Sequence, residues 1–317
     1  DMTINSGSAT TINGKLSAED IVITAGIGIT LGDVSDNEAM FASGSIKITS
    51  SSGDFTMTVG DVLRANGVFG VDNTNGITIT LQGQAIIGDL DTTNAGTNSS
   101  NTADIILNLP GQTGSVVANT VERVSAGQGD FTVFSGAPFT LNGAVTAGTI
   151  SVTSSGDLTV DNAMTSNPGN ITLISTGGFV EVDSDPANGG TFLISTVGGT
   201  LTIRAFDSLI IGDADITTLE DPARTAIADI PLDNIDTPAQ LNLVLTSTGP
   251  GQSFDDSGTF TQEPIGTELS GLVLFAEAAE WGSLDVTGAS GVVVLANQST
   301  SSGDLKLVAT EGDIRTV

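Results

Sequence analysis

Carboxylates carry most of the chemistry that this 317-residue sequence can offer, because it contains no histidine and no cysteine. A Ser-His-Asp triad, a Cys-His pair and an ordinary zinc site are therefore excluded. Acidic residues gather in three places, and hard oxygen ligands of this kind suit calcium. The three groups are Asp33, Asp36 and Glu38; Asp183 and Asp185; and Asp213, Asp215, Glu220 and Asp221.

The three acidic groups lack the spacing of known calcium loops. None matches the glycine-rich nonapeptide of calcium-binding β-rolls or the EF-hand loop that closes on a glutamate. Solvated acidic turns are the default interpretation of all three. We predict no cofactor, and calcium at Asp213, Asp215, Glu220 and Asp221 is the alternative left open.

One segment combines carboxylates with an aromatic ring. Trp281 directly follows Glu280 and lies near Glu277 in the stretch EAAEWGSLDV. Paired carboxylates can cleave glycosidic bonds. Such sites usually add basic residues or further rings, and this chain has eight Lys and Arg residues, one Trp and no Tyr. We therefore predict no catalytic residue and no enzyme, with Trp281 a partly buried surface residue.

The elements that would position these residues are strands. The chain is 38% apolar and 14% charged, which is too apolar for a disordered chain. Short alternations of Ile, Val, Leu and Thr are separated by Gly, Asn, Asp and Ser, and no segment keeps a period of 3.6 residues. Aromatic residues make up only 4%, which favours a thin aliphatic core.

Short units recur along the chain. The sequence LIST begins at Leu173 and again at Leu193, and SSGD begins at Ser51, Ser154 and Ser301, each time before an apolar alternation. Leading strands recur about every twenty to thirty residues, a period typical of stacked supersecondary units. We predict an all-β right-handed parallel β-helix, in which each copy covers the apolar face of the next. Tandem immunoglobulin-like β-sandwiches are the alternative fold.

Residues 1–317 are predicted to form one continuous solenoid that is a fragment of a longer chain. Two loop insertions are expected, at about 89–104 and 213–240. The first is polar and expected to be exposed. The second contains three prolines and a possible short helix over 221–228, capped by Asp221 with Pro222 at the first helical position. Such loops often carry recognition, and covering a strand edge is the alternative.

The charge balance restricts the partners. Thirty-seven acidic residues against eight basic ones give a net charge of −29, which repels phosphate backbones and anionic membranes. We predict no nucleic-acid partner and, without a run of eighteen apolar residues, no membrane insertion. A saline or calcium-containing exterior would tolerate this charge, and a merely soluble acidic protein is the alternative. The lack of cysteine favours a bacterial or archaeal origin.

Two long stretches resemble a known family. GTISVTSSGDLTVDNAMTSNPGNITLISTGG, from Gly148 to Gly178, and the segment from Gly271 to Ile314 are similar to the haemagglutinin-type repeats of large bacterial surface exoproteins, the filamentous-haemagglutinin-like family. The similarity covers most of the chain loosely. It implies a right-handed parallel β-helix, export to the cell surface or beyond, and a role in adhesion, biofilm or fibrous surface structure. No site residue of the family can be placed on this sequence, and its N-terminal secretion domain is not recognisable.

The predicted function is that of a structural or adhesive segment of a large bacterial surface or filament-forming protein, outside the cell. Its expected partners are copies of itself or neighbouring segments end to end, together with host-cell or matrix glycans or proteins. The alternative function is a carbohydrate-binding or carbohydrate-cleaving β-helix, as in a phage tailspike or lyase.

Overall fold

The computed structural model describes about two thirds of the chain, and every element in that part is a strand. The described residues are 1–32, 38–66, 76–93, 101–110, 118–167, 169–182, 194–196, 200–206, 209–211, 226–230, 242–247, 253–254, 269–270, 272–276, 279–281, 283–288, 292–295, 298–300, 303–309 and 314–316. None of them forms a helix of the length and apolarity needed to cross a bilayer. The chain divides into unit 1, residues 1–155 with 164–169, and unit 2, residues 156–163 with 170–317.

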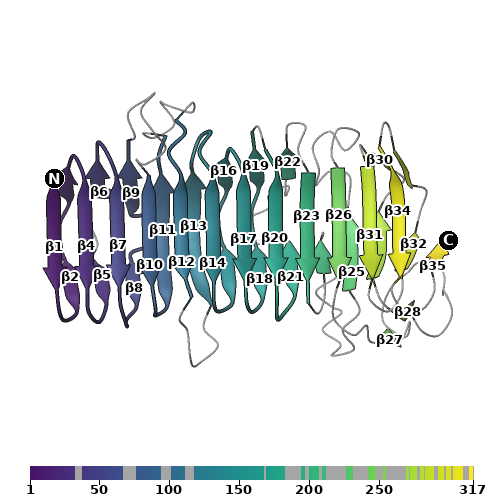
Figure 1. Ribbon diagram of the computed structural model, residues 1–317, viewed down its shortest axis with the longest axis horizontal. Coiled ribbons are helices and arrows are strands. Elements are labelled where there is room, and N and C mark those ends of the chain that lie inside the picture. Colours follow the sequence, from purple (N-terminus) through teal and green to yellow (C-terminus); the bar gives the residue numbers. More distant parts are fainter. Residues whose placement is uncertain are drawn as a thin grey trace. The chain divides into compact units, whose positions relative to one another are not determined.

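Unit 1 is a parallel β-solenoid whose widest side we call the first ladder. Its seven strands lie side by side in chain order, each paired in parallel with the next (Figure 1). They are β1 (Met2–Ser6), β4 (Ile21–Ala25), β7 (Ile46–Ser50), β10 (Ile77–Leu81), β12 (Ile105–Leu109), β14 (Phe131–Ser135) and β17 (Ile150–Ser154).

Two further parallel ladders complete each turn of unit 1. The second ladder contains β2 (Thr10–Ile12), β5 (Ile29–Leu31), β8 (Phe55–Met57), β11 (Ala85–Asp91), β13 (Asn119–Ser125) and β15 (Phe139–Leu141). The third contains β3 (Leu16–Ala18), β6 (Glu38–Ala42), β9 (Val62–Ala65), β16 (Val145–Ala147) and β19 (Met164–Ser166). The long strands β11 and β13 belong to both, because their first residues pair with the second ladder and their last residues with the third.

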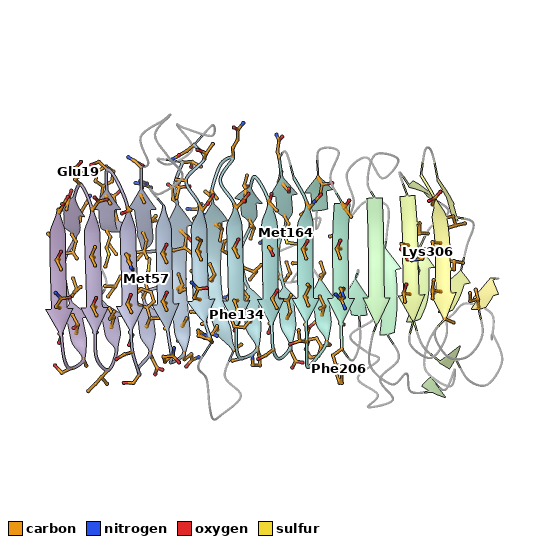
Figure 2. All side chains as sticks on the ribbon, in the orientation of Figure 1. Glu19, Met57, Phe134, Met164, Phe206 and Lys306 are labelled. Atoms are coloured by element: carbon orange, nitrogen blue, oxygen red, sulfur yellow. The ribbon has the colours of Figure 1, made fainter. Side chains whose placement is uncertain are left out.

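The core of unit 1 consists of columns of buried side chains, most of them aliphatic. Along β4 to β17 the first, third and fifth residue of each first-ladder strand is buried, as the two-residue period of a strand requires. The register stacks like on like, so the first positions form one buried column of Ile21, Ile46, Ile77, Ile105, Phe131 and Ile150. Met57 and Met164, labelled in Figure 2, belong to the same buried interior.

Unit 2 repeats the parallel pairing. One ladder contains β20 (Ile171–Ser175), β23 (Thr200–Ala205), β26 (Asn242–Ser247), β31 (Ser283–Gly288) and β34 (Leu305–Ala309), and a second contains β18 (Leu158–Val160), β21 (Val180–Val182) and β24 (Leu209–Ile211). A third joins β25 (Ala226–Ile230), β29 (Leu272–Ala276), β32 (Val292–Leu295) and β35 (Ile314–Thr316). The remaining strands are β22 (Ile194–Thr196), the parallel pair β30 (Ala279–Trp281) and β33 (Gln298–Thr300), and the antiparallel pair β27 (Ser253–Phe254) and β28 (Leu269–Ser270).

These ladders confirm the predicted parallel β-helix. Immunoglobulin-like sandwiches are wrong for the described residues, because their strands would pair antiparallel. The right-handedness of the coil stays a prediction, which rests on the general preference of parallel crossover connections for a right-handed path. One continuous solenoid over 1–317 also stays a prediction.

The first predicted loop, 89–104, begins later than expected. Residues 89–91 end strand β11, and residues 94–100 lie outside the described part. The flanking residues are buried rather than exposed: the Asp91 carboxylate accepts hydrogen bonds from the Thr93 backbone N–H and hydroxyl, each at 2.7 Å, and the Asn101 amide donates to the Thr92 carbonyl. Polar side chains are buried here because they satisfy one another and the backbone.

The second predicted loop, 213–240, contains a strand. Residues 226–230 form β25, so the last three residues of the short helix predicted over 221–228 are extended. Parallel pairing with β29 outweighs the local helix signal at these residues. Residues 213–225 and 231–240 lie outside the described residues.

Glycine is required in the SSGD corner at residue 53 for a steric reason. After β7 the chain turns through Ser51, Ser52 and Gly53 towards β8, and the backbone of the preceding rung passes directly beside it. A Cβ atom on Gly53 would lie 1.0 Å from the Ile27 carbonyl oxygen. Only glycine lets two successive rungs approach this closely at the corner.

This contact predicts a sharp difference between two corner glycines. Gly53→Ala is expected to lower the free energy of unfolding by about 1–3 kcal/mol, because the two rungs must move apart. Gly7 lies in the equivalent corner after β1, and a Cβ atom added there would have no atom within 4 Å. Gly7→Ala is therefore the matched control and is expected to leave stability nearly unchanged. Denaturant unfolding followed by circular dichroism measures both, and equal stability of the two variants would contradict the close approach.

Candidate binding surface

The acidic residues considered as alternative calcium ligands or as a sugar-cleaving pair fall mostly outside the described part of the chain. This applies to Asp33, Asp36, Asp183, Asp185, Asp213, Asp215, Glu220, Asp221 and Glu277. Glu280 and Trp281 are consecutive in β30, opposite Ser299 and Thr300 of β33, and their side chains are not described. Among the described residues, no three metal-ligating side chains come together.

Glu38, the described member of the first acidic group, belongs to an ion-pair network on the third ladder. Its carboxylate accepts from the ammonium of Lys15 and from the guanidinium of Arg64. Arg64 also donates through Nε to the Asp91 carboxylate at 2.9 Å. Lys15 directly precedes β3, and strands β3, β6, β9 and β11 lie next to one another, so the network runs across four rungs. Glu38 therefore has a structural role at this position.

A second ion pair lies on the neighbouring rungs. Arg123 in β13 donates to Asp89 in β11, and the two residues are opposite each other in the ladder. Burial raises the pKa of the Asp89 carboxyl, and the Arg123 charge opposes that rise without cancelling it. Three of the four Lys and Arg residues of unit 1, namely Lys15, Arg64 and Arg123, are thus used on this side of the solenoid.

Other carboxylates lie at the corners and bond from one rung to the next. Asp20, directly before β4, accepts from the Ser45 backbone N–H at 2.7 Å, and Ser45 directly precedes β7. Asp104 accepts from the Asp130 N–H at 2.9 Å, and Asp130 accepts from the Thr149 N–H at 3.1 Å. Glu19, labelled in Figure 2, marks this corner beside Asp20. Asp54 and Asp157, both in SSGD units, lie directly before β8 and β18. Their carboxylates accept hydrogen bonds from the backbone N–H groups of Gln84 and Phe179, respectively.

The corner carboxylates differ in their electrostatics. The Ser45 backbone N–H, helped by the Ser45 hydroxyl, holds the pKa of Asp20 below its ordinary value. Burial raises the pKa of Asp104, because the charged form loses water and also faces Asp130, while the hydrogen bond from the Asp130 N–H lowers it less. Ionisation therefore stabilises the fold at Asp20 and opposes it at Asp104.

The outward side of the first ladder in unit 1 differs in composition from the acidic corners and the third ladder. We call it the broad face. It consists of the second and fourth residue of each of the seven strands. Its fourteen side chains are Thr3, Thr24, Thr49, Thr78, Thr80, Thr132, Thr153, Asn5, Asn108, Ser151, Val22, Ile106, Phe134 and Lys47. No carboxylate is among them, although unit 1 has eleven described Asp and Glu residues elsewhere.

One large ring stands on the broad face. Phe134 in β14 is 49% exposed and points away from the core (Figure 2). In the ladder register it lies between Asn108 on β12 and Thr153 on β17, and Thr132 is its outward neighbour on the same strand. An aromatic ring is thus bordered by amide and hydroxyl groups on a nearly uncharged surface.

Sequence reasoning singled out Asp54 and Asp157 through the SSGD pattern but missed Asp20, Asp104 and the broad face. A signal was present, because the alternation Phe131-Thr132-Val133-Phe134 puts two apolar residues inward and the second phenylalanine outward. The absence of acidic side chains from the broad face became visible only when the strands were aligned by register. Asn170, directly before β20, bonds to the next rung in the same way, since its side-chain oxygen accepts from the Thr200 N–H at 2.8 Å.

Comparisons with known proteins add little. No protein-family model matches the sequence, and no curated protein matches it significantly. Among solved structures the chain matches a possible adhesin C-terminal domain from Caldicellulosiruptor kronotskyensis, with 7% sequence identity and a TM-score of 0.24, over 99% of this chain and 91% of that chain. A likeness at this TM-score bears on neither fold nor function. The resemblance to filamentous-haemagglutinin-like repeats rests on the repeats themselves.

The two corner carboxylates predict opposite effects of the same substitution. Asp20→Asn is expected to lower the melting temperature at pH 7, because stability from a lowered pKa is present above the unfolded-state pKa and lost as the pH falls through the folded one. Asp104→Asn is expected to raise it, because a raised pKa makes the charged form costly above the unfolded-state pKa.

Both asparagines keep an oxygen that can accept the hydrogen bond of the next rung, so each variant is a control for the other. Because the two sites are partly solvated, each change is expected to stay below about 1 kcal/mol. The Asp104→Asn difference is expected to disappear once the pH falls below the ordinary carboxyl pKa, and the Asp20→Asn difference only as the pH falls through the lowered pKa of Asp20. Thermal unfolding from pH 3 to pH 7 measures this, and shifts of the same sign at pH 7 would contradict the assignment.

Proposed function

We propose that this chain is an extracellular structural or adhesive segment of a large bacterial surface or filament-forming protein, and that it has no catalytic activity. The observation that carries this proposal is the repeated parallel stacking of rungs, in which every turn presents the same set of outward positions. A solenoid of this kind supplies extended side surfaces and length rather than an enclosed cavity. Such a segment serves to span distance and to present its side surfaces to partners.

The placement of charge supports an exterior location. A chain with a net charge of −29 is destabilised by self-repulsion, which salt weakens. In unit 1 the described carboxylates at the corners accept backbone hydrogen bonds, and others pair with Lys15, Arg64 and Arg123. These contacts compensate part of the negative charge within the fold. Salt outside the cell screens the repulsion among the remaining carboxylates.

The proposed partners are copies of the chain or neighbouring segments of a longer protein, joined end to end. A terminal rung of a parallel ladder presents unpaired N–H and C=O groups that can bond to another rung. Strand β1 is the first strand of the described first ladder, where it pairs with β4, and a neighbouring segment would join at its other edge. Host-cell or matrix glycans and proteins are the further partners of an adhesive role.

Surface exposure on intact cells tests the proposed function. Antibodies raised against residues 1–317 are expected to label unpermeabilised cells of the native organism, and brief protease treatment of those cells is expected to remove the label. Electron microscopy with the same antibodies is expected to place it on surface layers or fibres. Labelling that requires permeabilised cells would overturn the proposal.

A further inference from the structure

We infer that the broad face of unit 1 binds an uncharged polysaccharide, with Phe134 as the platform on which a sugar ring stacks. The inference deepens the proposed function, because it names the class of ligand that an adhesive segment would hold. It uses only the first ladder of unit 1, from β1 to β17, where all outward side chains are described.

The charge on the broad face selects the ligand class. Carboxylates are absent from its fourteen positions, and Lys47 is its single charged side chain, in a chain whose acidic residues outnumber basic ones by 37 to 8. An anionic polymer would be repelled by the net charge of the whole chain. A strongly cationic partner would be drawn to the acidic corners instead. An uncharged polar polymer is neither repelled by the net charge nor drawn to the acidic corners.

The polar side chains of the broad face match the groups of a polysaccharide. Seven threonines, two asparagines and one serine occupy ten of the fourteen positions, and hydroxyl and amide groups both donate and accept hydrogen bonds. The strands repeat these groups about every 4.8 Å along the ladder. A long row of this kind suits an extended polymer, whereas a small ligand needs a concave pocket.

Phe134 gives the surface a position of high affinity. The face of a phenyl ring carries partial negative charge, and the C–H groups on the flat side of a pyranose carry partial positive charge, so the two pack together. Asn108 and Thr153 border the ring on the adjacent rungs and can bond to the hydroxyls at the sugar's edge. About half of the Phe134 surface is open to such contact.

A second copy of the chain is a weaker occupant of the same face. Two chains that each carry a charge of −29 repel each other when they lie side by side, and a face with no carboxylate and one lysine supplies no compensating ion pairs. A neutral polysaccharide brings no such repulsion, so the observations favour it.

Binding of the purified chain to defined polysaccharides tests the inference. The probes are insoluble cellulose and chitin and soluble galactomannan, with polygalacturonate as the anionic arm. The wild-type chain is expected to bind at least one uncharged polymer with little dependence on salt, and not to bind polygalacturonate. Phe134→Ala is expected to weaken that binding about tenfold or more, as the loss of one stacked ring does elsewhere, and Phe134→Tyr is expected to retain it.

Phe206→Ala is the matched control, because Phe206 is 41% exposed but lies in unit 2, after β23, and not on the broad face. It is expected to bind within about twofold of the wild type, and both alanine variants are expected to unfold like the wild type because neither ring is buried. Lack of binding to every uncharged polymer, or equal binding by wild type and Phe134→Ala, would overturn the inference. So would a concentration-dependent dimer that Phe134→Ala dissociates in the absence of polysaccharide binding.

The binding assay and the cell-surface assay fail independently. A chain that labels intact cells but binds no uncharged polysaccharide contradicts this inference alone. A chain that labels only permeabilised cells contradicts the proposed function, whatever it binds in solution.

Discussion

In-register parallel hydrogen bonding between successive rungs is the constraint on which the described structure depends. Because each backbone bonds to the rung before and the rung after, a residue is placed directly over its counterpart, and every position becomes a column. A column inside the core accepts apolar side chains, as in the stack from Ile21 to Ile150, or small hydroxyl groups that bond to the backbone, as at Ser50 and Ser154. A corner column accepts only residues that tolerate the close approach of the next turn, which explains why Gly53 lies where the Ile27 carbonyl passes.

The same constraint decides where an acidic chain can hold its charge. Like charges in one column would lie about 4.8 Å apart along the ladder. In unit 1 the carboxylates avoid this in two ways: those of the third ladder alternate with Lys15, Arg64 and Arg123, and those of the corners accept backbone N–H groups. Asp104 and Asp130 show the cost where two acids do follow each other, since burial and the neighbouring charge raise the pKa of Asp104.

Once the acidic residues occupy the corners and the third ladder, the broad face is left without carboxylates. Its threonines suit the outward side of a strand, because β-branched residues are favoured there and their hydroxyls remain available to a partner. Phe134 is the departure from this pattern. A large ring held half-exposed among hydroxyl and amide groups has no role in the core, where Phe131 of the same strand is fully buried. That contrast is the reason for assigning a binding role to this face.

The sequence by itself determined the fold class, because two-residue alternations, glycine corners and recurring SSGD units all follow from the period of a stacked strand. It also indicated that Asp54 and Asp157 belong to corners. It did not determine which carboxylate pairs with which cation, since Glu38, Arg64 and Asp91 are separated by more than twenty residues each and meet only through rung register. The absence of carboxylates from the broad face was likewise hidden, because its members are scattered over seven separate strands. Only the tertiary structure, by stacking those strands, turned isolated threonines and one phenylalanine into a continuous surface.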